Sequence, residues 1–206
     1  MEYWNHNVHY QPVILDAVPA DCDAALDVGC GDGLLAVKLA SRCAAVTGID
    51  PSPQMITLAR QRAARTDPPA PDDPAPAVTF VQGDFLTHPF EEDGFGFVCA
   101  NTSVHHMGTE AALRAMARVL RPGGRLAVLG LGETGSPADL LPDLVAVPLN
   151  RYYQRTRGEG YPGDPKLPPD LTWAEVRETA RRVLPGVRYR RHLLWRYSLV
   201  WDKPVA

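Results

Sequence analysis

The sequence has no run of about 20 consecutive apolar residues, which is the length that a helix needs to cross a membrane. Its first residues, Met1–His6, are polar and aromatic, unlike the apolar centre of a signal peptide. On this basis we predict a cytoplasmic protein with no membrane partner.

Cysteine pairs of the Cys-x-x-Cys type are also missing. The four cysteines are Cys22, Cys30, Cys43 and Cys99, and none has a neighbouring histidine at the spacing of a zinc site. Reduced, partly buried thiols are the default in a cytoplasmic protein. We therefore predict no disulfide bond and no metal site.

The composition is that of an ordinary globular protein. The chain has 206 residues, of which 45% are hydrophobic and 22% charged, and we predict a single domain over residues 1–206. Residues 1–150 hold 9 Lys and Arg against 18 Asp and Glu, a net charge of −9, whereas residues 151–206 hold 12 against 6, a net charge of +6. The basic segment can mark an anionic partner. We favour the interpretation that this segment forms a solvated sheet edge and helix face, on which the arginines pair with nearby acidic side chains.

Residues 25–33, Ala-Leu-Asp-Val-Gly-Cys-Gly-Asp-Gly, are the most informative stretch. Leu26 and Val28 suit a buried strand, and three glycines follow at alternate positions. Glycine tolerates a positive φ and lets a ligand approach the backbone amides closely. Good helix formers then run from Leu34 to Ala40. A strand, a glycine turn and a helix in this order predict a cofactor-binding site.

Two classes of cofactor use such a turn. Dinucleotide-binding folds have the spacing Gly-x-Gly-x-x-Gly, but Leu34 occupies the position of that last glycine here. Asp27 and Asp32 would repel a pyrophosphate, whereas they suit a cationic amino-acid group. The segment closely resembles motif I of the class I S-adenosylmethionine-dependent methyltransferases, an aliphatic run followed by Asp-x-Gly-x-Gly-x-Gly. The resemblance implies that S-adenosylmethionine is the cofactor and S-adenosylhomocysteine the product.

Acidic residues also end the next two predicted strands, residues 44–50 and 78–81. Asp50 lies 21 positions beyond Gly29, where a carboxylate can accept hydrogen bonds from both ribose hydroxyls. The resemblance assigns Asp84 to the exocyclic amine of adenine and the backbone amide of Phe85 to a ring nitrogen. A helix cap at Asp50 and a tight turn at Gly83-Asp84 are the alternatives.

A catalytic base is expected after the fourth predicted strand, residues 95–100, because ligands lie at the carboxyl ends of parallel strands. His105 and His106 are the candidates, and a histidine with a pKa near neutrality can take a proton from a hydroxyl acceptor. In the alternative, neither histidine is a base, since an amine or thiol acceptor does not require a strong one.

The resemblance to class I methyltransferases implies that two further segments cover the site. Residues 1–23 are predicted to hold a helix that packs on the sheet. This segment either has only that role or also closes over the cofactor, and in the second case the closing residues would be Tyr3, Trp4, His6 and Tyr10. Residues 131–170 are a predicted substrate cover with a helix over 137–157, interrupted or kinked at Pro142 and Pro148. Its candidates for substrate contact are Arg151, Tyr152, Tyr153 and Arg155. In the alternative interpretation the helix only covers the core, and its arginines point into water.

The fold predicted from these elements is an α/β, Rossmann-like three-layer α/β/α sandwich with a seven-stranded, mostly parallel sheet and an antiparallel last strand. Residues 110–120 are a predicted helix, and Arg121–Gly124 a turn into a fifth strand over 125–130. A capping box at Thr172–Glu175 begins a helix through about residue 184, and residues 187–201 form the last two strands. The Pro- and Asp-rich residues 66–77 are a predicted surface loop.

The predicted function is methyl transfer from S-adenosylmethionine to a small-molecule acceptor, with His105 and His106 as catalytic candidates, in a monomer or homodimer. The predicted cofactor-binding residues are Asp27, Gly29, Cys30, Gly31, Asp32, Asp50, Pro51, Met55, Gly83, Asp84, Phe85, Asn101 and Tyr10. One alternative is a nucleic-acid methyltransferase, but Asn101 is followed by Thr-Ser-Val instead of the Pro-Pro-aromatic signature of amino-methylating enzymes. The other is a non-catalytic cofactor-binding scaffold.

Overall fold

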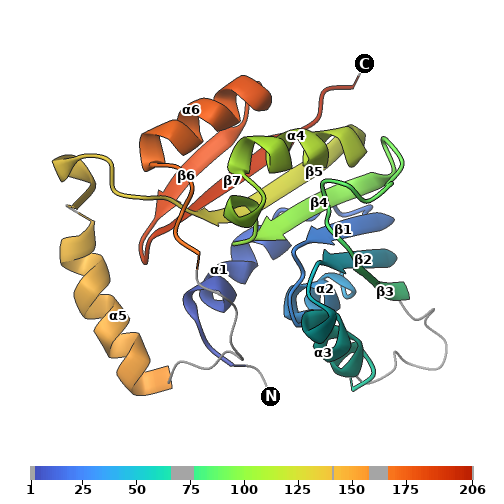
Figure 1. The fold of residues 1–206 in the computed structure, drawn as a ribbon, viewed down its shortest axis with the longest axis horizontal. Helices are drawn as coiled ribbons and strands as arrows, with labels where there is room; N and C mark the ends of the chain where they lie inside the picture. The colour runs from blue at the N-terminus through green and yellow to red at the C-terminus, as the bar shows by residue number, and fades with distance from the viewer. Residues whose placement is uncertain (1–2, 66–76, 141, 158–166, 206) are drawn as a thin grey trace.

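The computed structural model describes residues 3–65, 77–140, 142–157 and 167–205, and they form one seven-stranded sheet (Figure 1). The strand order is β3-β2-β1-β4-β5-β7-β6. Neighbouring strands from β3 to β5 run parallel, and β7 runs antiparallel to both of its neighbours. The strands are β1 (Ala24–Val28), β2 (Ala45–Asp50), β3 (Ala77–Gln82), β4 (Phe95–Asn101), β5 (Leu120–Leu131), β6 (Arg188–His192) and β7 (Arg196–Asp202). The predicted fold class is confirmed.

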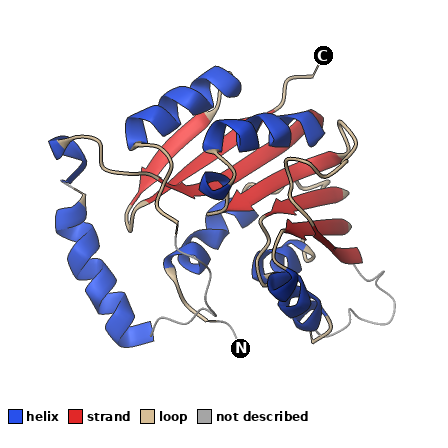
Figure 2. Cartoon of the chain, in the orientation of Figure 1, coloured by secondary structure: helices blue, strands red, loops and turns tan. Residues whose placement is uncertain are grey.

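Helices cover both faces of the sheet (Figure 2). They are α1 (His6–Leu15), α2 (Leu34–Leu39), α3 (Pro53–Ala63), η1 (Val104–His106), α4 (Thr109–Val119), η2 (Pro137–Leu140), α5 (Asp143–Arg157) and α6 (Trp173–Val183). Because side chains alternate along a strand, Leu26 and Val28 of β1 enter the core beneath α4 and α6, whereas Ala25 enters the core beneath α1 and α2. The short strand β1 therefore joins the two cores.

Local sequence signals explain where several helices begin. The Asn5 side chain accepts a hydrogen bond from the Val8 amide at 2.8 Å at the start of α1. Thr172 and Glu175 form the predicted capping box at the start of α6, with both reciprocal hydrogen bonds present. The predicted beginning of α6 is confirmed.

Two segments differ in detail from their predicted form. Residues 121–124, predicted as a turn, belong to the irregular first part of β5, where Gly123 has a φ of +76° and hydrogen-bonds to Lys203 through its amide at 2.9 Å. The helix predicted over 137–157 is divided into η2 and α5, so the interruption predicted at Pro142 is confirmed, whereas Pro148 lies inside α5 without interrupting it. Residues 66–76 of the predicted surface loop lie outside the described residues.

The prediction that the cysteines form no disulfide is wrong. Cys22 and Cys43 are joined, with their Cα atoms 4.7 Å apart, within the range of disulfide geometry. The cause is strand register: β1 and β2 run parallel with Ala24 opposite Ala45, so residues 22 and 43 lie side by side just before the two strands. Cys30 and Cys99 are buried free thiols. No helix in the described parts of the chain is long and apolar enough to cross a membrane.

Candidate active site

The carboxyl ends of β1, β2, β3 and β4 open into a pocket of about 1300 Å³. This is where an open parallel sheet binds its ligands. The predicted residues that line the pocket are Asp27, Gly29, Cys30, Gly31, Asp32, Asp50, Pro51, Met55, Gly83, Asp84, Phe85, Asn101, His105 and His106. Residues predicted from four separate strand ends thus meet in one cavity. Around it, the described residues contain no cluster of three or more His, Cys, Asp or Glu side chains suited to a metal ion.

The glycine turn after β1 has the backbone that its sequence predicts. Gly29 has a φ of +70°, and a Cβ atom at this position would lie 2.3 Å from the Cβ atom of Ser103. Ser103 in turn donates a hydrogen bond from Oγ to the carbonyl of Val28 at 2.5 Å, which joins the ends of β1 and β4. The amides of Gly29 and Cys30 both donate to the carbonyl of Ile49, so they build the turn against β2. A side chain at position 29 would break this junction.

Asp27 is fully buried at the end of β1 and lines the pocket. Its Oδ1 atom accepts a hydrogen bond from the thiol of Cys99 at 3.7 Å, whereas Oδ2 has no partner among the described residues. Burial raises the pKa of this carboxyl to about 7. A buried carboxylate oxygen with no donor is unfavourable by itself. The site therefore fits a ligand that brings a cationic N–H donor, such as an ammonium group.

Asp50 is held rigidly at the end of β2. Its Oδ2 atom accepts from the Gly31 amide and its Oδ1 atom from the Ser52 amide, both at 2.9 Å. A carboxylate oxygen can accept more than one hydrogen bond, so both oxygens keep the capacity to bind neighbouring hydroxyl groups. The helix cap considered at Asp50 is instead formed by Ser52, whose side chain accepts from the Met55 amide, whereas Asp50 closes the turn before it.

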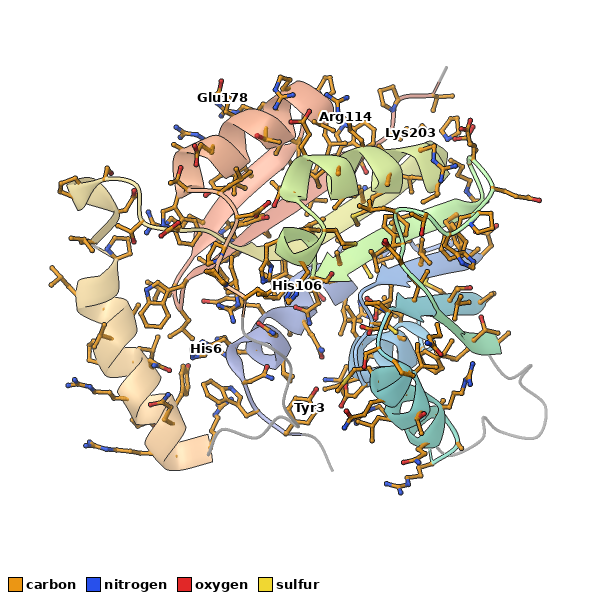
Figure 3. The ribbon with its side chains drawn as sticks, in the orientation of Figure 1. Tyr3, His6, His106, Arg114, Glu178 and Lys203 are labelled. Carbon is orange, nitrogen blue, oxygen red and sulfur yellow. A yellow bond between two sulfur atoms is a disulfide. The ribbon has the colours of Figure 1, made fainter. Side chains whose placement is uncertain are left out.

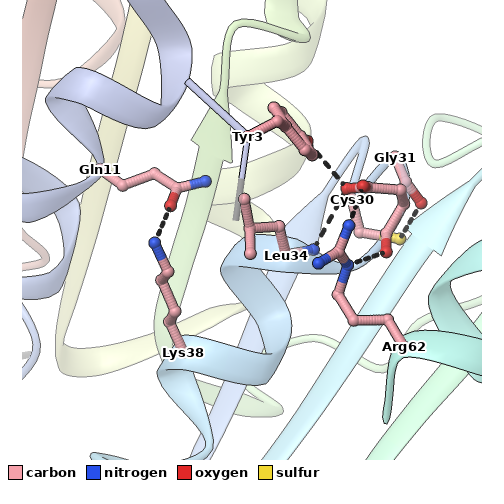
Figure 4. Close-up of polar contacts among 8 residues, drawn as sticks. Tyr3, Gln11, Cys30, Gly31, Leu34, Lys38 and Arg62 are labelled. Carbon is pink, nitrogen blue, oxygen red and sulfur yellow. Dashed lines mark hydrogen bonds and ion pairs between the residues drawn. The ribbon is translucent and has the colours of Figure 1, made fainter. Parts of the chain in front are cut away.

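Asp32 is bound by partners that the sequence did not predict, and Figure 4 labels three of them, Tyr3, Leu34 and Arg62. Arg62 of α3 forms an ion pair with its carboxylate and donates from Nε to its backbone carbonyl at 3.0 Å. The Tyr3 hydroxyl donates to Asp32 Oδ1 at 3.1 Å, and the Leu34 amide also contacts this atom. Asp32 thus links the glycine turn to α3 and to the N-terminal segment. No spacing in the sequence pairs residues 32 and 62.

Asp84 and Phe85 form the pocket wall after β3. Asp84 is exposed and closes a turn, because its Oδ1 atom accepts from the Leu86 amide at 2.9 Å. Phe85 is buried against Phe90 in the core beneath α4. The tight turn proposed as the alternative is present, and it places both residues on the pocket.

The two candidate bases differ in their environment. His105 is buried, and His106 is exposed with its ring centroid 4.2 Å from that of His105. Burial, together with the neighbouring charge of His106, lowers the pKa of His105 to about 4. His105 is therefore neutral at pH 7 and a weak base, so the pKa near neutrality expected of a catalytic histidine is not found at this residue.

The N-terminal segment contributes more residues to the pocket than predicted. Tyr3 and His6 line it, as His106 does, and Figure 3 labels all three residues. Tyr10 is not among the described lining residues; its ring packs against His9 and His192. The sequence analysis missed Asn5, Asn7, Val8 and Gln11, which line the pocket from α1 and its cap. Their signal was present: Asn7 and Gln11 are four positions apart and so share a helix face.

Of the predicted substrate cover, residues 131–170, the described pocket wall includes Leu131 and Leu167 but none of the four candidates for substrate contact. Arg151, Tyr152 and Arg155 are exposed on α5, and Tyr153 contacts Trp4 with ring centroids 5.1 Å apart. α5 extends away from the sheet (Figure 1). Leu167, which follows the undescribed residues 158–166, does line the pocket.

The fold is that of a class I methyltransferase that uses S-adenosylmethionine. A family model described as "Methyltransferase domain" matches residues 26–128, and the chain belongs to this family. It is 34% identical over 204 residues to an uncharacterised methyltransferase of Mycobacterium tuberculosis, covering 98% of each chain. It is also 39% identical over 123 residues to the 27-O-demethylrifamycin SV methyltransferase of Amycolatopsis mediterranei, covering 59% of this chain and 43% of that protein.

Solved structures share the fold at low sequence identity. A methyltransferase of Methanosarcina mazei, titled as S-adenosylmethionine-dependent, superposes with a TM-score of 0.66 at 19% identity and covers 95% of this chain and 98% of its own. Phosphoethanolamine N-methyltransferase 2 of Haemonchus contortus, solved with S-adenosyl-L-methionine, gives a TM-score of 0.65 at 17% identity and covers 95% of this chain and 52% of its own. These likenesses support the architecture.

Proposed function

We propose that this enzyme transfers the methyl group of S-adenosylmethionine to a small-molecule acceptor and releases S-adenosylhomocysteine. The observation that carries the proposal is the unpartnered, buried Oδ2 atom of Asp27 on the pocket wall, because it requires a cationic donor that the methionine end of this cofactor has. When bound, the cofactor supplies an electrophilic methyl group on a sulfonium.

The residues of the pocket have separate roles in this proposal. Asp27 holds the ammonium group, Asp50 the two ribose hydroxyls, and Asp84 with the amide of Phe85 the adenine ring. The remaining work of the protein is to align the acceptor with the methyl group and to exclude water. The segment from Tyr3 to Gln11 lines the pocket and contributes to both.

If the acceptor is a hydroxyl, the role of proton acceptor falls to His106 because His105 is unsuited to it. His105 holds its proton too weakly at neutral pH, since its pKa is about 4. His106 is exposed beside it and lines the same pocket.

A small-molecule acceptor is supported by relatives and by the surface charge. Similar proteins include the rifamycin methyltransferase and a ubiquinone biosynthesis O-methyltransferase of Xanthomonas oryzae, 34% identical over 134 residues. In the basic C-terminal segment, several arginines pair with local acids: Arg182 with Glu110, Arg188 with Asp202 and Arg191 with Asp139. This pairing reduces the positive field that a nucleic-acid partner would need.

The role of Asp27 can be tested with two ligands that differ only at the methionine end. Asp27→Asn should weaken binding of S-adenosylhomocysteine at least about tenfold by calorimetry, because a charge-assisted hydrogen bond is lost. 5′-Methylthioadenosine has no ammonium group, so the same variant should bind it as the wild type does. An equal loss for both ligands would show a general distortion of the pocket.

Catalysis is tested by measuring S-adenosylhomocysteine released from S-adenosylmethionine with a set of small hydroxyl, amine and carboxylate acceptors. Binding without release, for every acceptor, would favour the non-catalytic scaffold. Binding of NAD in preference to S-adenosylmethionine would overturn the proposed cofactor site.

A further inference from the structure

Arg196, the first residue of β7, is a buried cation on the pocket wall. It is 8% exposed and lines the pocket. Within the described residues it forms no ion pair with a carboxylate, and its hydrogen bonds go to neutral oxygens. Nε and Nη2 donate to Asn7 Oδ1 at 3.0 and 2.6 Å, and Nη1 donates to the carbonyls of Leu194 and Trp195 at 3.1 and 3.3 Å.

A buried charge without a counter-charge is unfavourable by several kcal/mol. Burial lowers the pKa of Arg196 to about 10, so the guanidinium is still protonated at neutral pH. Buried or half-buried arginines elsewhere in this protein do have acidic partners, as Arg62 has Asp32 and Arg191 has Asp139. Arg196 thus lacks the partner that this fold provides for comparable arginines.

Asn7 completes the environment of this charge. Its Oδ1 atom accepts from Arg196 and also from the Thr102 hydroxyl at 3.0 Å. Because a guanidinium can only donate, its two hydrogen bonds identify the amide atom that faces Arg196 as the oxygen, which leaves Nδ2 as the remaining donor. Nδ2 has no hydrogen-bond partner among the described residues, and Asn7 lines the pocket beside Arg196.

We propose that Arg196 and Asn7 form a subsite that binds a carboxylate of the methyl acceptor. The guanidinium supplies the missing charge partner, and Asn7 Nδ2 supplies a neutral N–H donor. One buried guanidinium balances one negative charge, so a carboxylate fits the subsite better than a phosphate dianion. This inference rests on the proposed methyl transfer and names the class of its acceptor.

Arg196 and Asn7 line the same pocket as His105 and His106. The pKa of His105 is lowered by burial first and by His106 next, and the Arg196 charge contributes further in the same direction. The anionic end of the acceptor would thus be held near the residues proposed to face the reacting atoms.

The test measures binding of neutral and anionic isosteres to protein saturated with S-adenosylhomocysteine. The probes are benzoate against benzamide, hexanoate against hexanamide, and inorganic phosphate, all by calorimetry. We expect each carboxylate to bind at least tenfold more tightly than its amide, and phosphate to bind more weakly than the carboxylates. Arg196→Gln should remove the preference, and Arg181→Gln, an exposed arginine on α6, should keep it.

Asn7→Asp is the sharper variant, because it keeps the oxygen that accepts from Arg196 and gives the guanidinium an internal counter-charge. It should abolish carboxylate binding while raising Tm, and it remains informative if Arg196→Gln does not fold. Three results would overturn the subsite: equal binding of acids and amides, no binding of any carboxylate, or a preference for carboxylates that survives in Asn7→Asp. Each would show that the role of Arg196 is only structural, connecting α1 to the turn between β6 and β7. Tighter binding of phosphate would overturn the carboxylate assignment.

The same samples separate this inference from the proposed function. Failure to bind S-adenosylhomocysteine would count against the proposed function itself. Release of S-adenosylhomocysteine with neutral acceptors but not with carboxylates would support methyl transfer and overturn the subsite.

Discussion

Asp27 combines complete burial with an oxygen that has no donor, and this has a consequence for stability. Its pKa is about 7 in the folded protein and about 4 in an unfolded chain, so the native state binds more protons between these values. The free energy of unfolding therefore falls as the pH rises from about 4 to 7, and the loss persists above pH 7. The cofactor-free enzyme carries this penalty at neutral pH.

Asp27→Asn should remove that penalty. Between pH 5 and pH 8, urea denaturation should show the wild type losing at least about 1 kcal/mol more stability than the variant. Asp16→Asn, at an exposed carboxylate, should follow the wild type. Parallel pH profiles for all three proteins would mean that Asp27 titrates normally.

Asp50→Ala should weaken binding of both S-adenosylhomocysteine and 5′-methylthioadenosine by about 10- to 100-fold, because hydrogen bonds from the ribose hydroxyls to a charged group are lost. Calorimetry at fixed pH measures both affinities. An unchanged affinity would remove Asp50 from the cofactor site.

The two histidines should separate in kinetics. With a hydroxyl acceptor, His106→Ala should lower kcat by about 10² to 10⁴ while the affinity for S-adenosylhomocysteine stays within about twofold. His105→Ala should leave the shape of the pH–rate profile above pH 5 unchanged, since a group with a pKa of about 4 is already deprotonated there. Full activity of the double variant would refute a histidine base.

At the scale of elements, α3 is fixed to the glycine turn by the ion pair of Arg62 with Asp32. The pair is mostly buried, with side-chain exposures of 24% and 7%. Removing one partner leaves the other as a buried, uncompensated charge. The position of α3 and the shape of the cofactor turn are therefore coupled.

Arg62→Met should lower the free energy of unfolding by about 2–3 kcal/mol, less than for a fully buried pair because Arg62 is partly exposed. The double variant Arg62→Met with Asp32→Asn should recover most of that loss in urea denaturation. If the stability losses of the two single variants add in the double variant, the ion pair does not couple α3 to the glycine turn.

The elements were largely predictable because each has a local signal. The apolar runs of β1 and β2, the alternate glycines after Val28 and the capping box at Thr172 depend only on neighbouring residues. Other features join residues 20 or more positions apart, namely the contacts of Asp32 with Arg62 and Tyr3 and the Cys22–Cys43 bond. The absence of an acidic partner at Arg196 likewise depends on which distant residues pack around it. They follow from strand register and helix packing, which no local pattern specifies.

At the scale of the whole molecule, the disulfide closes a loop with a sequence separation of 21 that contains β1, the glycine turn and α2. Constraining an unfolded chain by a loop of this length contributes about 3 kcal/mol. The bond thus encloses Asp27 and the glycine turn, which are one part of the proposed cofactor site.

Treatment with dithiothreitol should lower the Tm of the wild type by several degrees. The variant with Cys22→Ala and Cys43→Ala should have a Tm as low as that of the reduced wild type, and dithiothreitol should not change it. Alkylation before and after reduction, followed by mass spectrometry, counts the thiols. Four alkylated cysteines in the unreduced, unfolded protein would show that the bond does not form.

α5 touches the rest of the described protein at few points, among them the His6–Asn150 hydrogen bond of 2.7 Å and the Trp4–Tyr153 contact. Leu144, Val145 and Tyr152 are 75%, 56% and 60% exposed, so little apolar packing opposes its opening. Local opening is easiest where few buried contacts hold an element. Its backbone amides should therefore exchange with deuterium long before those of β4 and β5, and a protease should cut within α5 while the sheet and its pocket remain intact.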